Sequence, residues 1–170
     1  PADYFLKVYY EDPSLLVVEK DAGIPCEKTP QALKPSLVEI VNAYLQKKAP
    51  SGTRPYLGLM HRLDTDTSGL MVYTRKKEAN TLAEQFSSHR IERRYLAIVE
   101  GRVAQENGSV RKKLVKEEGR GGRKVRIAEK EEGQSAQTDY HVLERYSQAT
   151  LLEVTVKTGR THQVRVHFAS

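Results

Sequence analysis

The sequence has few of the features that secreted, redox-active or membrane-spanning proteins require. It has one cysteine, Cys26, among 170 residues, so no disulfide can form within the chain and a disulfide-rich secreted scaffold is excluded. No apolar run approaches the roughly 20 residues that a transmembrane helix needs. The first residues also lack the pattern of a signal peptide. We therefore expect a cytoplasmic protein that does not enter a membrane.

Several common catalytic motifs are absent as well. There is no phosphate-binding Walker loop and no glycine-rich dinucleotide fingerprint, and there is no G-x-S-x-G nucleophile elbow of a hydrolase. His61, His162 and His167 could in principle bind zinc, but no cysteine pair and no H-E-x-x-H motif accompany them. The sequence therefore predicts neither a bound metal nor a nucleotide cofactor.

The composition is that of a folded, basic domain. Charged residues make up 29% of the chain and hydrophobic residues 38%, which is typical of a globular protein rather than a disordered one. Lysine and arginine outnumber aspartate and glutamate by 28 to 22, for a net charge of +6. A basic surface suits a polyanion such as RNA or DNA. On charge alone, simple solubility is an equally good explanation.

Hydrophobic periodicity predicts more strands than helices. The expected strands span residues 4–10, 15–19, 69–74, 93–99, 137–143 and 150–156, and residues 57–60 form a further short apolar run. With no internal repeat and no linker, this pattern predicts a single α+β domain over residues 1–170. Its sheet is expected to be mixed but mainly antiparallel, and to be flanked by helices and loops.

Three helices are expected between these strands. Ser36 and Glu39 form an S-x-x-E capping box ahead of apolar residues at helical spacing. A second amphipathic helix covers residues 79–86. Thr161 is the expected N-cap of a last helix. The inner face of that helix carries Val164 and Phe168.

Residues 102–133 are the least apolar stretch of the chain, and we expect them to form a long, mobile hairpin or loop. Their basic residues include Arg111, Lys112, Lys113, Lys116, Arg120, Arg123, Lys124, Arg126 and Lys130. Such a run suits an arm that follows the phosphates of a nucleic acid. A solvated loop without a specific partner explains the same composition equally well.

Three places in the chain gather residues that could carry chemistry. Asp64 lies in a turn between two apolar runs, although it could simply accept backbone N–H bonds there as an Asx-turn. Residues 159–165 place two arginines, a histidine and a glutamine in one turn, where they could bind phosphate or form a solvated basic helix start. Tyr95, beside Arg93 and Arg94 on a strand, could stack on a base or pack as a core or edge tyrosine.

Four segments resemble one known family. Residues 61–70, H-R-L-D-T-D-T-S-G-L, resemble the signature H-R-L-D-x-x-T-S-G-L of RluA-type pseudouridine synthases. Histidine at position 61 favours this branch, because related synthases that act on ribosomal RNA often have glycine there. Residues 17–25 resemble the early V-V-x-K-P-x-G-x-P stretch of the family, residues 95–101 its tyrosine-bearing strand, and residues 158–167 its T-G-R-x-H-Q-I-R motif.

The resemblance implies an isomerase that converts specific uridines of structured ribosomal or transfer RNA into pseudouridine. The reaction cuts the N1–C1′ bond, turns the uracil and rejoins it through C5, and it requires no cofactor or metal. The implied partner is RNA, and a monomer is the default expectation. Asp64 is implied as the catalytic carboxylate, either as a nucleophile at C1′ or as a base at C2′.

The resemblance also assigns roles to other residues. Arg165 is implied as the ion-pair partner of Asp64, and Tyr95 is expected to stack on the uracil and to help remove the C5 proton. Arg62 is expected to fill the place that the flipped uridine vacates. The remaining expected RNA contacts are His61, Arg94, Arg160, His162 and Gln163. If the pair of Asp64 with Arg165 is buried, removing Arg165 should cost about 3–5 kcal/mol of stability.

Two departures from the family pattern bear on these expectations. Asp21 stands where the family has proline after Lys20. The G-D-x-x-Y-G stretch and the strands that follow the last helix in the family are missing, as is the S4-type RNA-binding domain that some members carry. We therefore expect residues 1–170 to be a catalytic domain without its C-terminal strands.

Two other functions fit parts of the sequence. A non-catalytic RNA-binding or RNA-chaperone domain of the same fold would use the basic surface and the stacking tyrosine, but it would have no use for a buried carboxylate facing a polyanion. A protein-interaction module would tolerate loss of the basic residues. A steep salt dependence of RNA binding would exclude that module.

Overall fold

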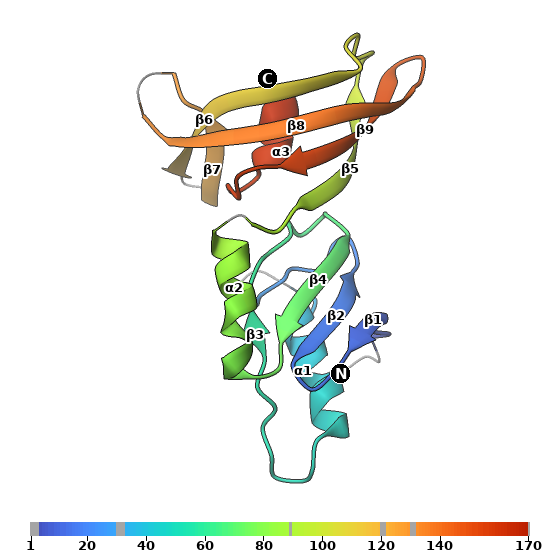
Figure 1. Ribbon diagram of the computed structural model, residues 1–170, viewed down its shortest axis with the longest axis vertical. Helices are drawn as coiled ribbons and strands as arrows, with labels where there is room; N and C mark the ends of the chain where they lie inside the picture. The colour runs from blue at the N-terminus through green and yellow to red at the C-terminus, as the bar shows by residue number, and fades with distance from the viewer. Residues whose placement is uncertain (1–3, 30–32, 89, 120–121, 130–131, 170) are drawn as a thin grey trace. The chain divides into compact units, whose positions relative to one another are not determined.

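The computed structural model describes residues 4–29, 33–88, 90–119, 122–129 and 132–169. The chain divides into two compact units, Pro1–Ser88 and His89–Ser170, and each unit has its own sheet (Figure 1). Each unit also has its own apolar core. Within the described ranges, no helix is long and apolar enough to cross a membrane.

The first unit is a four-stranded antiparallel sheet with helices. Its strands are β1 (Val8–Glu11), β2 (Leu15–Lys20), β3 (Gly58–Leu59) and β4 (Gly69–Thr74), in the order β1-β2-β4-β3. Its helices are α1 (Leu37–Lys48), the short 3-10 helix η1 (Lys77–Ala79) and α2 (Asn80–Ser87). Strand β2 pairs with β4 over its whole length, from Leu15 opposite Thr74 to Lys20 opposite Gly69.

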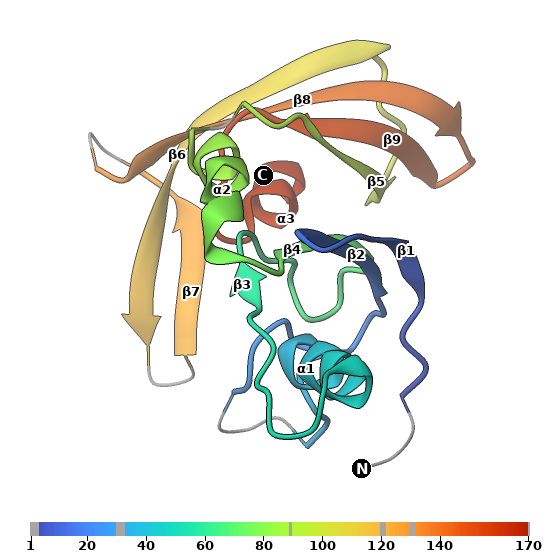
Figure 2. The ribbon, with the colours of Figure 1, turned by 60° about the horizontal axis from the view of Figure 1, so that its bottom comes forward.

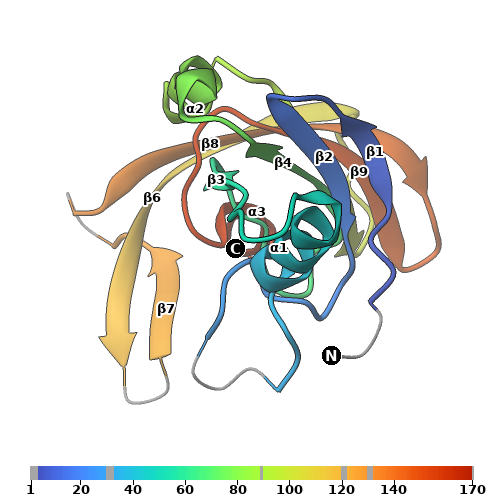
Figure 3. The ribbon, with the colours of Figure 1, turned by 90° about the horizontal axis from the view of Figure 1, so that it is seen from below.

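Helix α1 supplies much of the core of this unit. The Ser36 hydroxyl accepts the Glu39 N–H, and the Glu39 carboxylate accepts the Ser36 N–H at 2.9 Å, so the predicted capping box is present. The helix lies against the sheet beside β2 and β4 (Figure 3). The buried apolar residues at this contact are Leu16, Val18, Leu37, Val41, Leu45, Met71 and Tyr73.

The second unit is a five-stranded antiparallel sheet with one short helix. Its strands are β5 (Arg93–Glu100), β6 (Asn107–Gly119), β7 (Gly122–Ile127), β8 (Gln134–Arg145) and β9 (Ala149–Val156), in the order β5-β9-β8-β6-β7. Helix α3 (Gln163–Phe168) lies against the curved inner face of this sheet (Figure 2). Val164 and Phe168 pack there on Val142, Leu152 and Val154, which confirms the predicted inner face.

The predicted α+β class with mainly antiparallel pairing is confirmed. All the pairs that the structure describes are antiparallel, and the strands form two sheets where the sequence predicted one. The basic stretch of residues 102–133 contains the β6–β7 hairpin, and β6 also pairs with β8. Arg120 and Lys130 of that stretch lie outside the described residues.

Three polar side chains are buried between α3 and the sheet. Thr138, Gln163 and His167 are each at most 4% exposed. His167 Nδ1 lies 2.9 Å from Thr138 Oγ1, and Gln163 Nε2 donates to the same hydroxyl at 2.9 Å. Because buried polar groups are stable only when hydrogen-bonded, these contacts fix the helix at one place on the sheet.

Acid should weaken this unit through His167. Burial lowers the pKa of His167 below its usual 6.5, and the nearby Lys112 charge lowers it further. The unfolded chain therefore binds a proton more readily than the folded one, so stability falls as the pH drops from 6.5 towards the folded pKa. We expect urea denaturation to show this loss in the parent and a smaller loss in His167→Gln, which keeps a hydrogen-bonding group but does not titrate. An identical pH dependence in both proteins would contradict the expectation.

Candidate active site

Asp64 lies in a closed turn that leads into β4. The turn is closed by the Thr67 N–H, which donates to the Asp64 carbonyl at 3.1 Å. Gly69 then enters the strand with a φ of 141°, a conformation that side-chain-bearing residues rarely adopt. Asp64 itself is half-buried. The carboxylate is therefore carried by a turn fixed to the central strand of the first unit.

A buried lysine, Lys20, is hydrogen-bonded to this turn. Lys20 is fully buried, with 0% of its surface exposed. Its ammonium donates to three backbone carbonyls, those of Asp21 at 2.9 Å, Ile24 at 2.7 Å and Thr65 at 2.7 Å. Burial lowers the pKa of Lys20, while surrounding acidic groups, including Asp66 and Asp64, oppose that shift. One charged group thus ties the loop after β2 to the carbonyl of Thr65, the residue that follows Asp64.

The loop after β2 makes two further contacts with the same turn. Gly23, with a φ of 80°, donates its N–H to the Thr65 carbonyl at 2.9 Å. Cys26 Sγ donates to the Leu63 carbonyl at 3.2 Å and lies 3.3 Å from the Leu63 N–H. The residues on either side of Asp64 are therefore both held by residues 20–26, which fixes the backbone that carries Asp64.

His61 and Arg62 precede Asp64 and have different surroundings. His61 Nε2 accepts the Val72 N–H at 3.0 Å, and its ring stacks on Phe86 with centroids 4.6 Å apart. These contacts hold the start of the signature against β4 and α2. Arg62 is exposed and forms an ion pair with Glu27 at 3.3 Å. The RNA contacts expected of both residues stay predictions.

Tyr95 and Arg94 lie on opposite faces of β5. Tyr95 is half-buried and packs against the core of the second unit. Arg94 points to the exposed face, where it forms ion pairs with Glu92 and Glu153. Because successive residues of a strand alternate between its faces, Arg94 cannot contact a base stacked on Tyr95 from the same side.

Gln163, which was expected to contact RNA, is buried and hydrogen-bonded within the second unit. Its side chain is 4% exposed, and its amide nitrogen donates to the Gln137 carbonyl and to Thr138 Oγ1, both at 2.9 Å. Its amide oxygen accepts the Arg160 N–H at 3.1 Å and the Thr158 hydroxyl at 2.7 Å. Gln163 therefore fixes the loop that carries Arg160, and the RNA contact expected of it stays a prediction.

The start of α3 also differs from the prediction. The N-cap is His162, not Thr161, and its side chain makes no capping hydrogen bond. His162 has a φ of 52°, in the left-handed region that residues other than glycine enter at a cost of about 1–3 kcal/mol. This backbone kink turns the chain from the Arg160 loop into the helix.

Arg165 is exposed on α3. It lines an open hollow of about 600 Å³ together with Lys124, Val125, Arg126, Ile127, His162, Val166 and Ala169. Its Nη1 lies 3.5 Å from His162 Nδ1. The ion pair expected between Arg165 and Asp64 stays a prediction.

Sequence reasoning missed the structural role of Lys20. A signal was present, because Leu16, Val18 and Lys20 share the inward face of β2 at alternate positions. A lysine at the end of a buried face must find partners for its charge.

Among the described residues, no group of three or more histidine, cysteine, aspartate or glutamate side chains is arranged to hold a metal ion.

Known proteins resemble this chain over nearly its whole length. Residues 14–170 match the RNA pseudouridylate synthase family. Ribosomal large subunit pseudouridine synthase D of Xanthomonas campestris pv. campestris is 39% identical over 170 residues, which are 99% of this chain and 49% of that protein. An RNA pseudouridine synthase of Aquifex aeolicus is 35% identical over 173 residues, 100% of this chain and 54% of that protein.

A solved structure shares both sequence and fold with the chain. Human RNA pseudouridylate synthase domain containing 4 superposes with a TM-score of 0.76 and 26% identity, covering 96% of this chain and 63% of the human chain. The fold and the signature turn are thus those of the RNA pseudouridylate synthases. The chain belongs to the RNA pseudouridylate synthase family, as the RluA-type signature predicted. It spans about half the length of the curated relatives it matches.

Replacing Lys20 should loosen the turn that carries Asp64. Lys20→Met keeps the apolar stem but leaves three carbonyls without their shared donor, and an unsatisfied buried group costs about 1–3 kcal/mol. We expect urea denaturation to show a loss of that size. Lys7→Met is the control, because Lys7 is an exposed lysine bonded to Glu19, and it should change stability by less than about 0.5 kcal/mol. Equal stability of Lys20→Met and the parent would show that the ammonium does not hold the turn.

Proposed function

We propose that this chain is the catalytic part of a pseudouridine synthase that acts on large-subunit ribosomal RNA, with Asp64 as its catalytic carboxylate. The observation that carries the proposal is the anchoring of the Asp64 turn. A fully buried ammonium and the Cys26 thiol hold the peptides beside Asp64, in a chain of the pseudouridylate synthase family. Such pre-organisation suits a group that must meet one atom of a ribose.

The chemistry needs only rearrangement of the uridine itself. The N1–C1′ bond breaks, the uracil turns, a C5–C1′ bond forms, and the proton on C5 is lost while N1 gains one, so the product is an isomer of the substrate. Asp64 would act at C1′ as a nucleophile or at C2′ as a base. Tyr95 would stack on the turning uracil and assist loss of the C5 proton. Arg165 would pair with Asp64 as its partner cation.

The proposed substrate follows from the names of similar proteins. The relative from Xanthomonas campestris is named for the large ribosomal subunit, and the net charge of +6 suits a polyanion. We propose that the chain works as a monomer in the cytoplasm, where ribosomal RNA is accessible. Transfer RNA is the second substrate to test.

The activity can be tested by release of tritium from C5 of uridine in unmodified transcripts of large-subunit ribosomal RNA and of transfer RNA. We expect release from the ribosomal transcript by the parent. Asp64→Asn should reduce it by at least about 10³-fold. Arg165→Ala should lose most of the activity, because Asp64 would then lack its proposed partner cation.

The stability of both variants separates catalysis from folding. Asp64 is half-buried and Arg165 is exposed, so each variant should unfold within about 0.5 kcal/mol of the parent. Release by Asp64→Asn at the parental rate would refute the role of Asp64. No release by the parent, with RNA binding intact, would instead favour the non-catalytic RNA-binding function.

Tyr95→Phe separates stacking from proton transfer. The phenylalanine ring keeps the packing and the stacking surface but has no hydroxyl. If the hydroxyl assists loss of the C5 proton, kcat for tritium release should fall by about 10²-fold or more, while KM for the RNA should stay close to the parental value. An unchanged kcat would leave Tyr95 with stacking alone.

A further inference from the structure

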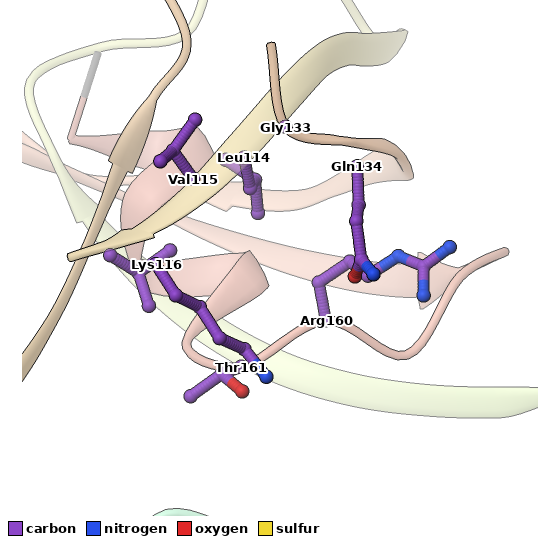
Figure 4. Close-up of a pocket in the computed structure, with 8 residues that line it drawn as sticks. Leu114, Val115, Lys116, Gly133, Gln134, Arg160 and Thr161 are labelled. Carbon is purple, nitrogen blue, oxygen red and sulfur yellow. The ribbon is translucent and has the colours of Figure 1, made fainter. Parts of the chain in front are cut away.

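A second pocket lies in the second unit, between the β6–β7 hairpin and the loop before α3. It has a volume of about 230 Å³ and is lined by Leu114, Val115, Lys116, Val125, Gly133, Gln134, Arg160 and Thr161. Its lining combines aliphatic side chains with polar and basic ones. Figure 4 shows the Lys116 side chain extending towards Thr161, and Gln134 extending towards Arg160.

The hairpin register explains why Leu114, Lys116 and Val125 line the pocket together. Lys116 pairs with Val125 across the hairpin, and Leu114 pairs with Ile127. Directly opposed residues and alternate residues share a face of a sheet. Leu114, Lys116 and Val125 therefore face the same side, with the apolar residues beside the cation.

Gly133 makes the back of the pocket possible. Its φ is 80°, and a Cβ at this position would lie 2.7 Å from the Leu114 carbonyl oxygen and 2.8 Å from a methyl group of Val115. Only glycine lets the backbone pass this close to β6. The chain before Gln134 is therefore pressed against the strand, which sets the shape of the wall.

The charges around the pocket have one sign. Among the described residues that line it, Lys116 and Arg160 are basic and none is acidic. Arg160 is held in place, because its Nε donates to the Ser135 carbonyl at 3.2 Å and its N–H to the buried Gln163 at 3.1 Å. The nearby Glu117 and Glu132 are both bonded to Arg126. Two cations beside aliphatic walls suit a ligand that is flat and apolar at one end and anionic at the other.

The pocket adjoins the hollow that contains Arg165. Val125 lines the pocket together with Arg160, and it lines the hollow together with His162. A single RNA strand that passes Arg165 would therefore reach the pocket with its next nucleotides.

We propose that this pocket binds one unstacked nucleotide of the RNA that flanks the target uridine. The base would lie between Leu114 and Val125, and its phosphate between Lys116 and Arg160. The inference rests on the proposed function, because it takes the strand to be the RNA substrate. It gives the β6–β7 hairpin a defined nucleotide site in addition to its general positive charge.

The test compares two chains of equal charge, a short fluorescent oligouridylate and the same sugar–phosphate chain without bases. We expect the parent to bind the oligouridylate about tenfold more tightly, since a stacked base contributes on that scale. Val125→Phe fills the pocket and should lower this preference by about fivefold or more. Thr161→Phe, at the exposed rim, should act in the same direction and serves if Val125→Phe does not fold.

Lys116→Ala and Arg111→Ala form a matched pair, because each removes one exposed positive charge from β6 and the two side chains point to opposite faces of the sheet. Lys116→Ala should weaken binding of both chains about fivefold, and Arg111→Ala less than twofold. Equal effects of the two, or an unchanged base preference in the filled variants, would overturn the proposal. Displacement of the oligouridylate by uridine monophosphate at equal concentration would show that the pocket binds a free nucleotide. That result would also overturn the proposal.

Tritium release from the ribosomal transcript by the same preparations reports on the proposed function separately. If the parent is inactive but its preference for bases is lost in Val125→Phe, the nucleotide pocket is supported and the proposed synthase activity is refuted. If the parent is active but the preference for bases is unchanged in Val125→Phe and Thr161→Phe, the pocket is refuted and the synthase activity is supported.

Discussion

The position of Asp64 depends on the charge of Lys20, buried beneath it. An ammonium group out of water is stable only when hydrogen-bonded, and Lys20 meets this demand with the carbonyls of Asp21, Ile24 and Thr65. The cost of burying the charge is thus offset by contacts that bring two distant segments together. Strand β2, the loop after it and the signature turn cannot shift separately without exposing a donor or an acceptor.

The second unit uses the same principle with neutral groups. Gln163 connects the Arg160 loop to β8. His167 and Gln163 both hydrogen-bond to the Thr138 hydroxyl. These polar residues lie on the inner side of α3, while Arg165 is exposed on the same helix. In both units, therefore, a buried polar residue fixes the backbone that presents a residue proposed for chemistry or RNA contact.

Local signals predicted the parts of the fold that depend on neighbours in sequence. The bounds of β4 follow from its first residue, Gly69, and the polar residues on either side, and α1 begins at the capping box of Ser36 and Glu39. Alternation cannot say which strands pair, so the division into two sheets was missed. The burial of Gln163 was missed for a related reason. Its motif is polar and basic, and nothing in that motif shows that the Gln163 side chain packs against β8.

The central claim is that Asp64, carried by its anchored turn, catalyses the formation of pseudouridine. The most direct measurement is nucleoside analysis of an unmodified large-subunit ribosomal RNA transcript after incubation with the parent chain and with Asp64→Asn. The account predicts that pseudouridine appears with the parent, at the expense of an equal amount of uridine, and is absent with the variant. Pseudouridine formed equally by both proteins, or by neither, would contradict it.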